Sequence, residues 1–437
     1  MKGVATDAAD RHPSARCISA RPQPGDITVH HALLPGAIGA GAKSARARMR
    51  EFHFLGHCSV EPDPVYLDHN ATTPLLPDVV EAMLPYLREH FGNPSSRHVY
   101  GRRTHDAIER ARGHVAALIG SDADEIIFTS GGTEANNLAI RGTTARTSRR
   151  RVVTSTVEHP ATARPVAWLE RQGWEVVRVG VDAGGRARVP ELDSAITSAT
   201  ALVTIMHSNN ETGVLQPVRE AVYYARRAGA CVHTDAAQSV GKVPIDVRAM
   251  DVDLLSIAGH KLYAPKGIGA LYVRRGTVLE ALTLGAGHER GLRPGTENVA
   301  SIVGFGAACA TARHDLDKES LRARTLRDRL WEQLAQAIPD LALNGNADNR
   351  LPNTLNVRFP RVSGETLLAA TPEVAASTGS ACHEGGESAS AVLLAMGIPA
   401  TAALGSVRLT LGRATNESEI DRAAAGLARA WHALVRK

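Results

Sequence analysis

A lysine and an aspartate near the middle of the chain form the first group of residues that could do chemistry. Lys261 follows the apolar residues 254–258 and is set among glycines, and Asp235 follows the apolar residues 230–232 closely. Such runs are typical of buried strands, and side chains at the ends of neighbouring parallel strands face one cleft. Burial disfavours the ammonium form of lysine, so Lys261 is expected to exist partly as the neutral amine that attacks carbonyl groups.

The cofactor pyridoxal 5′-phosphate (PLP) needs such a pair. A lysine carries its aldehyde as an imine, and a carboxylate keeps its ring nitrogen protonated so that the ring accepts electrons. Alone, a lysine between glycines is more often a solvated turn residue. The facing acid, Asp235, favours the catalytic interpretation of Lys261.

A phosphate cradle is expected where residues 125–129, a predicted strand, meet a helix that opens at Glu134. The glycines of the intervening turn permit close approach of a ligand, and the helix N-terminus offers free N–H groups. The sequence leaves open whether Ser130 or Thr133 simply caps this helix.

Three polar residues follow or interrupt other predicted strands. His159 comes after residues 152–157 and can stack on a cofactor ring or act as an acid or base. Asn210 follows residues 201–206 and either hydrogen-bonds a ring hydroxyl or belongs to a turn. Arg408 has apolar neighbours in a strand, so it is expected to bind a carboxylate.

Cys382 lies in a loop of small and polar residues, 377–388, and is followed by His383. These surroundings suit a thiol that moves and reacts, although most cysteines are buried and inert. The other cysteines are widely spaced and form no CxxC pair, so no zinc or redox site is predicted. They are Cys17, Cys58, Cys231 and Cys309.

The composition indicates an α/β protein of 437 residues with enough apolar content, 43%, for two domains. Its net charge of +5 is too small and diffuse to indicate a nucleic-acid partner. We find neither an apolar run long enough to span a membrane nor the pattern of a secretory signal, so a cytoplasmic location is expected.

Strands that alternate with helices predict a mostly parallel sheet. We expect a disordered extension at residues 1–62, with Met49 as an alternative start or a targeting peptide as a weaker alternative. An N-terminal arm is predicted at 63–80 and a large domain at 81–312. A smaller domain, 313–437, is expected to carry the cysteine loop and Arg408. Separate helices, at 303–312 and 318–337, are predicted on the two sides of the last boundary.

Ten segments, in order and correctly spaced, resemble the cysteine desulfurases and the related selenocysteine lyases, which are PLP enzymes of fold type I. They are YLDHNATTP, GNPSS, FTSGGTEANN, EHPA, NNETG, HTDAAQ, GHK, RPGTEN, GSAC and VRLTLGR. The resemblance covers roughly residues 65–435. It implies a PLP-binding large domain with a mostly parallel seven-stranded sheet flanked by helices, and a smaller α+β C-terminal domain packed with the N-terminal arm.

The resemblance also implies roles for individual residues. Lys261 would carry the cofactor as a Schiff base, Asp235 would pair with the ring nitrogen, and His159 would stack on the ring. The ring oxygen would be steered by Asn210, which would also contact the substrate, and by Gln238.

The cofactor phosphate would be held by three residues of the same chain, and a threonine would come from the second protomer of a homodimer. These residues are Gly132, Thr133 and His260, with Thr296 from the partner. Many relatives carry a serine hydroxyl two residues before the histidine of GHK, where this chain has Ala258. One phosphate contact is therefore expected to be absent.

The activity implied is conversion of L-cysteine to L-alanine. Arg408 would bind the substrate carboxylate, and Cys382 would receive the sulfur as a persulfide. A sulfur acceptor, such as an iron–sulfur scaffold protein, would take the sulfur onward. Three alternatives stay open: a selenocysteine lyase acting on L-selenocysteine, a plain aminotransferase, and a catalytically silent sulfur-relay protein.

Overall fold

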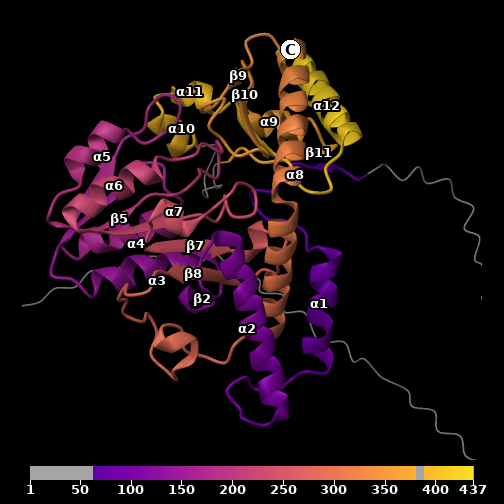
Figure 1. Cartoon of the computed structure of the whole chain (residues 1–437). Coiled ribbons are helices and arrows are strands. Elements are labelled where there is room, and N and C mark those ends of the chain that lie inside the picture. Colours follow the sequence, from indigo (N-terminus) through magenta and orange to yellow (C-terminus); the bar gives the residue numbers. More distant parts are fainter. Residues whose placement is uncertain (1–62, 380–387, 437) are drawn as a thin grey trace, which may run out of the picture. The chain divides into compact units, whose positions relative to one another are not determined.

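The computed structural model describes residues 63–379 and 388–436, so the predictions for residues 1–62 and for Cys382 lie outside it. Its central element is a seven-stranded sheet flanked by helices (Figure 1). In spatial order the strands are β2 (Ile126–Thr129), β8 (Gly269–Val273), β7 (Leu254–Ala258), β6 (Cys231–Asp235), β5 (Thr200–Thr204), β3 (Arg151–Ser155) and β4 (Glu175–Val179).

All neighbouring strands of this sheet are parallel except those that involve β8, which runs antiparallel to β2 and β7. Every residue of β5, β7 and β8 is buried, as expected for strands covered on both faces. The predicted α/β class and mostly parallel seven-stranded sheet are therefore confirmed. Glu125, which we placed in β2, instead ends a short 3₁₀ turn, Ala123–Glu125.

From residue 63 onward, seven α-helices precede or connect these strands. They are α1 (Pro77–Arg88), α2 (Val99–Ile119), α3 (Gly132–Thr144), α4 (Pro160–Arg171), α5 (Val189–Ala195), α6 (Val218–Ala228) and α7 (Val247–Met250). Helix α6 shows how the sequence ends such a helix. It stops at Gly229, whose φ of 66° lies in the left-handed region that favours glycine.

The structure corrects the prediction of two helices at 303–312 and 318–337, because one helix of 39 residues, α8 (Val299–Ala337), covers both. Neither glycine nor proline occurs between Gly306 and Ile338, so no residue interrupts the backbone hydrogen bonds. The first part of α8 packs against α1 and α2 (Figure 1), and its last part packs against α12 (Glu417–Val435).

The C-terminal part contains a three-stranded antiparallel sheet in the order β12 (Ser406–Thr410), β10 (Thr354–Arg358) and β9 (Ala342–Leu343). A short parallel pair joins β1 (Val65–Tyr66) to β11 (Val374–Ala375). The remaining helices are α9 (Gly364–Ala369), α10 (Ala391–Ala395) and α11 (Ala400–Ala403).

Among the described residues, the largest cluster of buried apolar residues lies around the seven-stranded sheet, and a second large cluster lies in the C-terminal part. Three smaller clusters accompany them. Val65 and Leu67 pack in the second cluster, with Leu330 of α8 and Val407 of β12. The exact domain boundaries stay predictions. No helix within residues 63–379 and 388–436 has the length and apolar character needed to cross a membrane.

Candidate active site

A cavity of about 300 Å³ lies where β3, β5, β6 and β7 end. Its volume is within the range typical of small-ligand sites. Nine of the residues that the sequence singled out line it: Gly132, Thr133, His159, Asn210, Asp235, Gln238, His260, Lys261 and Arg408. Thr296 is exposed and does not line this cavity. The structure thus brings nine residues together, and their individual roles stay predictions.

Lys261 reaches the cavity from a 3₁₀ turn, Gly259–Lys261, directly after β7. Its Nζ donates hydrogen bonds to the backbone oxygens of Asn70 and Ala71, the latter at 2.7 Å. Burial, and next the charge of Arg408, lower the pKa of Lys261 to about 8. The neutral amine, which is the form that bonds covalently to a carbonyl group, is therefore easier to reach near neutral pH than for an ordinary lysine.

Asp235 ends β6 and is buried, and its carboxylate is held by two donors. The amide of Asn136 in α3 donates to Oδ2 at 2.6 Å, and the backbone N–H of Ala237 donates to Oδ1 at 3.0 Å. These contacts fix the carboxylate at the cavity wall, where it can hold a proton on a ring nitrogen.

The turn that we predicted to cradle an anion lies between β2 and α3, and anion binding there stays a prediction. The residue before α3 is Gly131, and no side chain caps the helix, so the alternative of a Ser130 or Thr133 cap is wrong. A Cβ added to Gly132 would lie 3.2 Å from the Cβ of Ala258, so a glycine keeps this corner open. Ala258 lines the cavity, and its methyl side chain offers no hydroxyl to a phosphate.

Two histidines border the cavity in neutral form. His159 caps α4, where its Nδ1 accepts a hydrogen bond from the N–H of Ala161, which leaves Nε2 as the donor of the neutral ring. Burial is the largest cause that lowers the pKa of His159. For His260, burial and next the charge of Lys261 lower the pKa to about 4. A neutral ring suits His159 for stacking on the cofactor. The neutral ring of His260 can donate one N–H.

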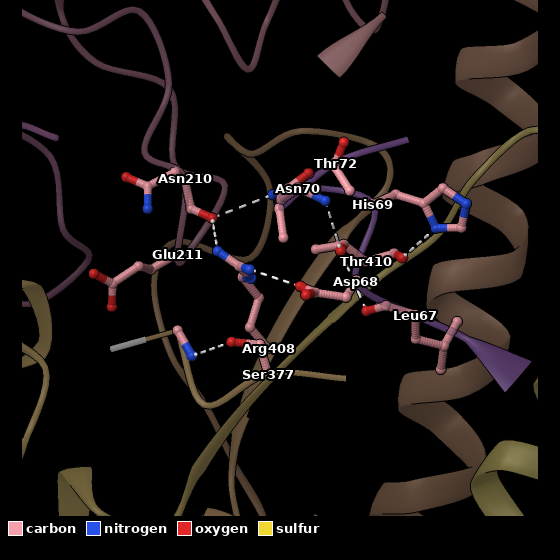
Figure 2. A network of polar contacts seen from close by, with 12 residues as sticks. Leu67, Asp68, His69, Asn70, Thr72, Asn210, Glu211, Ser377, Arg408 and Thr410 are labelled. Atoms are coloured by element: carbon pink, nitrogen blue, oxygen red, sulfur yellow. Dashed lines mark hydrogen bonds and ion pairs between the residues drawn. The ribbon is translucent and has the colours of Figure 1, made fainter. Parts of the chain in front are cut away.

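Sequence reasoning missed Asn70, which lines the cavity and contacts three other lining residues, Lys261, Gln238 and Asn210. Its backbone oxygen accepts from Lys261 and, at 2.9 Å, from the amide of Gln238. Its side-chain amide donates to the backbone oxygen of Asn210 at 3.3 Å (Figure 2). Asn70 lies in the segment YLDHNATTP, which we had used only as evidence of family.

Lys242 is a second residue that the sequence did not reveal. Its side chain is partly buried, and its Nζ donates to Asn70 Oδ1 at 3.1 Å and to Gln238 Oε1 at 3.0 Å. No carboxylate in the described part of the chain forms an ion pair with it. Burial, and next the charges of Lys261 and Arg408, lower the pKa of Lys242 to about 7.

This burial predicts a pH effect on stability. The pKa of Lys242 is about 7 in the folded chain and 10.5 ordinarily. Between these two pH values the amine of Lys242 is protonated mainly in the unfolded chain, so the free energy of unfolding rises with pH. In PLP-free protein, Lys242→Met should make this rise shallower by up to ~1.4 kcal/mol per pH unit. Denaturant unfolding at several pH values would measure it, with exposed Lys266→Met as control. Equal slopes for wild type and Lys242→Met would contradict it.

Comparison with known proteins identifies the family. The family model described as aminotransferase class-V matches residues 65–423. A cysteine desulfurase of Nostoc sp. (strain PCC 7120) is 46% identical over 361 residues, which are 82% of this chain and 90% of that relative. The chain belongs to the cysteine desulfurase family. A cysteine desulfurase IscS of Anaeromyxobacter dehalogenans (strain 2CP-C) is also 46% identical, over 365 residues, with coverage of 82% and 90%.

Solved structures agree with this assignment. A NifS-like protein has a TM-score of 0.79 and 33% identity, and the match covers 86% of this chain and 100% of that one. SspA in complex with cysteine has a TM-score of 0.71 and 35% identity, with coverage of 79% and 98%. Cysteine desulfurases depend on PLP, so this chain is a PLP-dependent enzyme. The predicted family and cofactor are confirmed.

The cavity of this cysteine desulfurase homologue fits PLP. The open corner at Gly132 and the uncapped start of α3 suit a phosphate, Lys261 suits the aldehyde, and Asp235 suits the ring nitrogen. Among the described residues, no cluster of His, Cys, Asp or Glu could hold a metal ion.

Proposed function

We propose that this chain converts L-cysteine to L-alanine and transfers the sulfur to Cys382. The observation that carries the proposal is the placement of Lys261, Asp235 and Arg408 around one cavity in a member of the cysteine desulfurase family. The C–S bond of L-cysteine breaks and an S–S bond forms at Cys382. In the overall balance, the proton lost from the Cys382 thiol appears in the new C–H bond of alanine.

Each residue then has a defined task. PLP, when bound, supplies an electron sink for negative charge at the substrate α-carbon. Asp235 holds the proton on the ring nitrogen, Lys261 takes and returns the proton at the α-carbon, and Arg408 binds the substrate carboxylate. The neutral ring of His159 closes one wall of the cavity.

We assign the thiol chemistry to Cys382 because it lies in the GSAC segment that resembles the family's sulfur-accepting loop. The two cysteines within the described residues, Cys231 and Cys309, are poorly suited to this chemistry. Burial raises the pKa of both Cys231 and Cys309 thiols above the ordinary range, so neither is a thiolate at neutral pH. Neither residue lines the cavity.

We also propose a homodimer in which Thr296 completes the partner's phosphate site. Thr296 is exposed and lies outside the cavity of its own chain, which supports this role. The surface around the end of α1 and the start of α2 exposes Leu87, Phe91, Val99 and Tyr100, an apolar patch suited to a second copy. Light scattering would test the dimer, and a monomer at micromolar concentration would contradict it.

Onward delivery of the persulfide sulfur to an iron–sulfur scaffold or another acceptor is part of the proposal, supported by relatives named IscS. The cytoplasmic location expected from the sequence is proposed as well, and cell fractionation would test it. L-selenocysteine stays the alternative substrate.

Assays of alanine formation from L-cysteine and L-selenocysteine test the function. A cysteine desulfurase forms alanine from L-cysteine and carries persulfide on the protein. Alanine from L-selenocysteine alone would identify a selenocysteine lyase, and the absence of alanine from both would favour the silent relay protein.

Arg408→Lys should raise KM for L-cysteine by about tenfold or more, because a lysine cannot form the bidentate contact of a guanidinium. The value of kcat should change less. Steady-state kinetics would measure both values, with Arg413→Lys as a control outside the cavity. An unchanged KM would show that Arg408 has a structural role only.

Asp235→Asn should lower alanine formation by at least about a hundredfold, because the amide keeps the size of the side chain but cannot stabilise a protonated ring nitrogen. Absorbance of the bound cofactor would show that the site still forms, and exposed Asp193→Asn on α5 is the control. Full turnover in Asp235→Asn would overturn this role.

A further inference from the structure

The guanidinium of Arg408 already has a carboxylate partner within the chain. Arg408 lies in β12 and is buried, and its Nη2 donates to Asp68 Oδ1 at 2.7 Å (Figure 2). Its Nη1 donates to the backbone oxygen of Asn210 at 3.0 Å. Within the described residues, its buried Nε has no hydrogen-bond partner. Asp68 itself does not line the cavity.

Backbone pairing holds Asp68 in this position. Asp68 forms a parallel bridge with Thr410 of β12, whose N–H donates to Leu67 at 2.7 Å. On the other side, the N–H of Asn70 donates to the Thr410 hydroxyl at 3.0 Å. The side chains of Arg408 and Asp68 are only 7% and 22% exposed. The pair is therefore a built, mostly buried contact rather than a surface ion pair, which would contribute little.

This contact restricts how Arg408 can bind a ligand. Each edge of a guanidinium that binds a carboxylate through two N–H groups includes Nη2, so Asp68 and a ligand carboxylate must share that nitrogen. A ligand that carries only a carboxylate brings a second anion close to Asp68, and like charges at a desolvated site repel strongly. An amino acid also brings an ammonium group, which offsets this repulsion.

We propose that Asp68 is a specificity-determining residue, which weakens binding of plain carboxylates at Arg408 and so favours zwitterionic amino acids. The inference depends on the proposed function only in that Arg408 is the carboxylate-binding residue. Asp68 acts through Arg408 and is a positioning residue.

Propionate is a suitable probe, because it has the carbon skeleton of alanine without the ammonium group and cannot form an imine. Calorimetric titration of propionate into the purified PLP-containing chain would compare wild type, Asp68→Asn and Asp68→Glu, with propionamide as the uncharged control. We expect Asp68→Asn to bind propionate about tenfold more tightly or better, and Asp68→Glu, which keeps the charge, to stay close to wild type.

Thermal unfolding separates this role from a purely structural one. Without ligand, Asp68→Asn should melt at a lower temperature than wild type, because Arg408 loses its partner. Added propionate should raise the melting temperature of Asp68→Asn more than that of wild type. Asp68→Ser, a smaller neutral variant, serves the same test if Asp68→Asn does not fold.

The outcomes are distinct. Tighter propionate binding in the neutral variants and lost binding in Arg408→Met support the proposal. Unchanged or weaker binding in Asp68→Asn or Asp68→Ser, with binding still lost in Arg408→Met, overturns the role of Asp68 and leaves that of Arg408 intact. Equal binding by wild type and Arg408→Met overturns carboxylate binding by Arg408, and with it that part of the proposed function.

Discussion

Lys261→Ala is expected to lower the rate of alanine formation by about a thousandfold or more. The substitution removes both the amine that bonds to the cofactor aldehyde and the base that moves the α-proton, and acid–base catalysis alone contributes ~10²–10⁴ in rate. The other two amines of this region cannot replace it. Lys242 donates to Asn70 and Gln238 and does not line the cavity, and Lys266 is exposed.

Chromatographic assay of alanine would measure this loss, with Lys266→Ala as the matched control. Borohydride reduction of the wild-type holoenzyme, followed by peptide mapping, should place the cofactor label on Lys261. A label on a different lysine, or alanine formation by Lys261→Ala at the wild-type rate, would remove Lys261 from the mechanism.

Cys382→Ala is expected to abolish alanine formation from L-cysteine while sparing much of any activity on L-selenocysteine. Desulfuration needs a thiolate that attacks the substrate sulfur, whereas selenium leaves carbon more readily. An ordinary cysteine thiol has a pKa of ~8.5, so only a few per cent is thiolate at neutral pH without a nearby cation or polar loop. His383, next in the sequence, is a candidate for that help.

Parallel assays with both amino acids would test this effect, and Cys231→Ser is the control because the thiol of Cys231 lies outside the cavity. Full desulfuration of L-cysteine by Cys382→Ala would refute the role of Cys382. Equal loss with both substrates would show instead that the variant disturbs the PLP site.

The sheet and its strand ends were predictable because each local signal agreed with the global fold. The buried runs at 230–232 and 254–258 became β6 and β7, and they placed Asp235 and Lys261 at one edge as parallel strands require. The error at α8 has a physical cause. We placed two helices on the two sides of the expected domain boundary after Ala312, but a domain boundary does not end a helix when no glycine, proline or cap interrupts it.

The parts of the site that escaped prediction depend on contacts between distant residues. Asn70 meets Lys261 through a backbone oxygen, which every residue possesses, so its side-chain type carries no signal. In the sequence, Lys242 is an ordinary lysine after a glycine, and only the folded structure shows that its Nζ contacts Gln238. The pairing of Asp68 with Arg408 joins residues 340 positions apart. Family motifs supplied the roles of Gln238, His260 and Thr296, which local patterns did not indicate.

The most direct test of the proposed function is a single turnover of the holoenzyme with L-cysteine in the absence of any reductant or sulfur acceptor. Alanine would be counted per active site, and mass spectrometry of peptides prepared without reduction would locate the sulfur. We predict one alanine per site and one additional sulfur on the peptide that contains Cys382. Alanine without protein-bound sulfur, or persulfide only on Cys231 or Cys309, would contradict the proposed transfer of sulfur to Cys382.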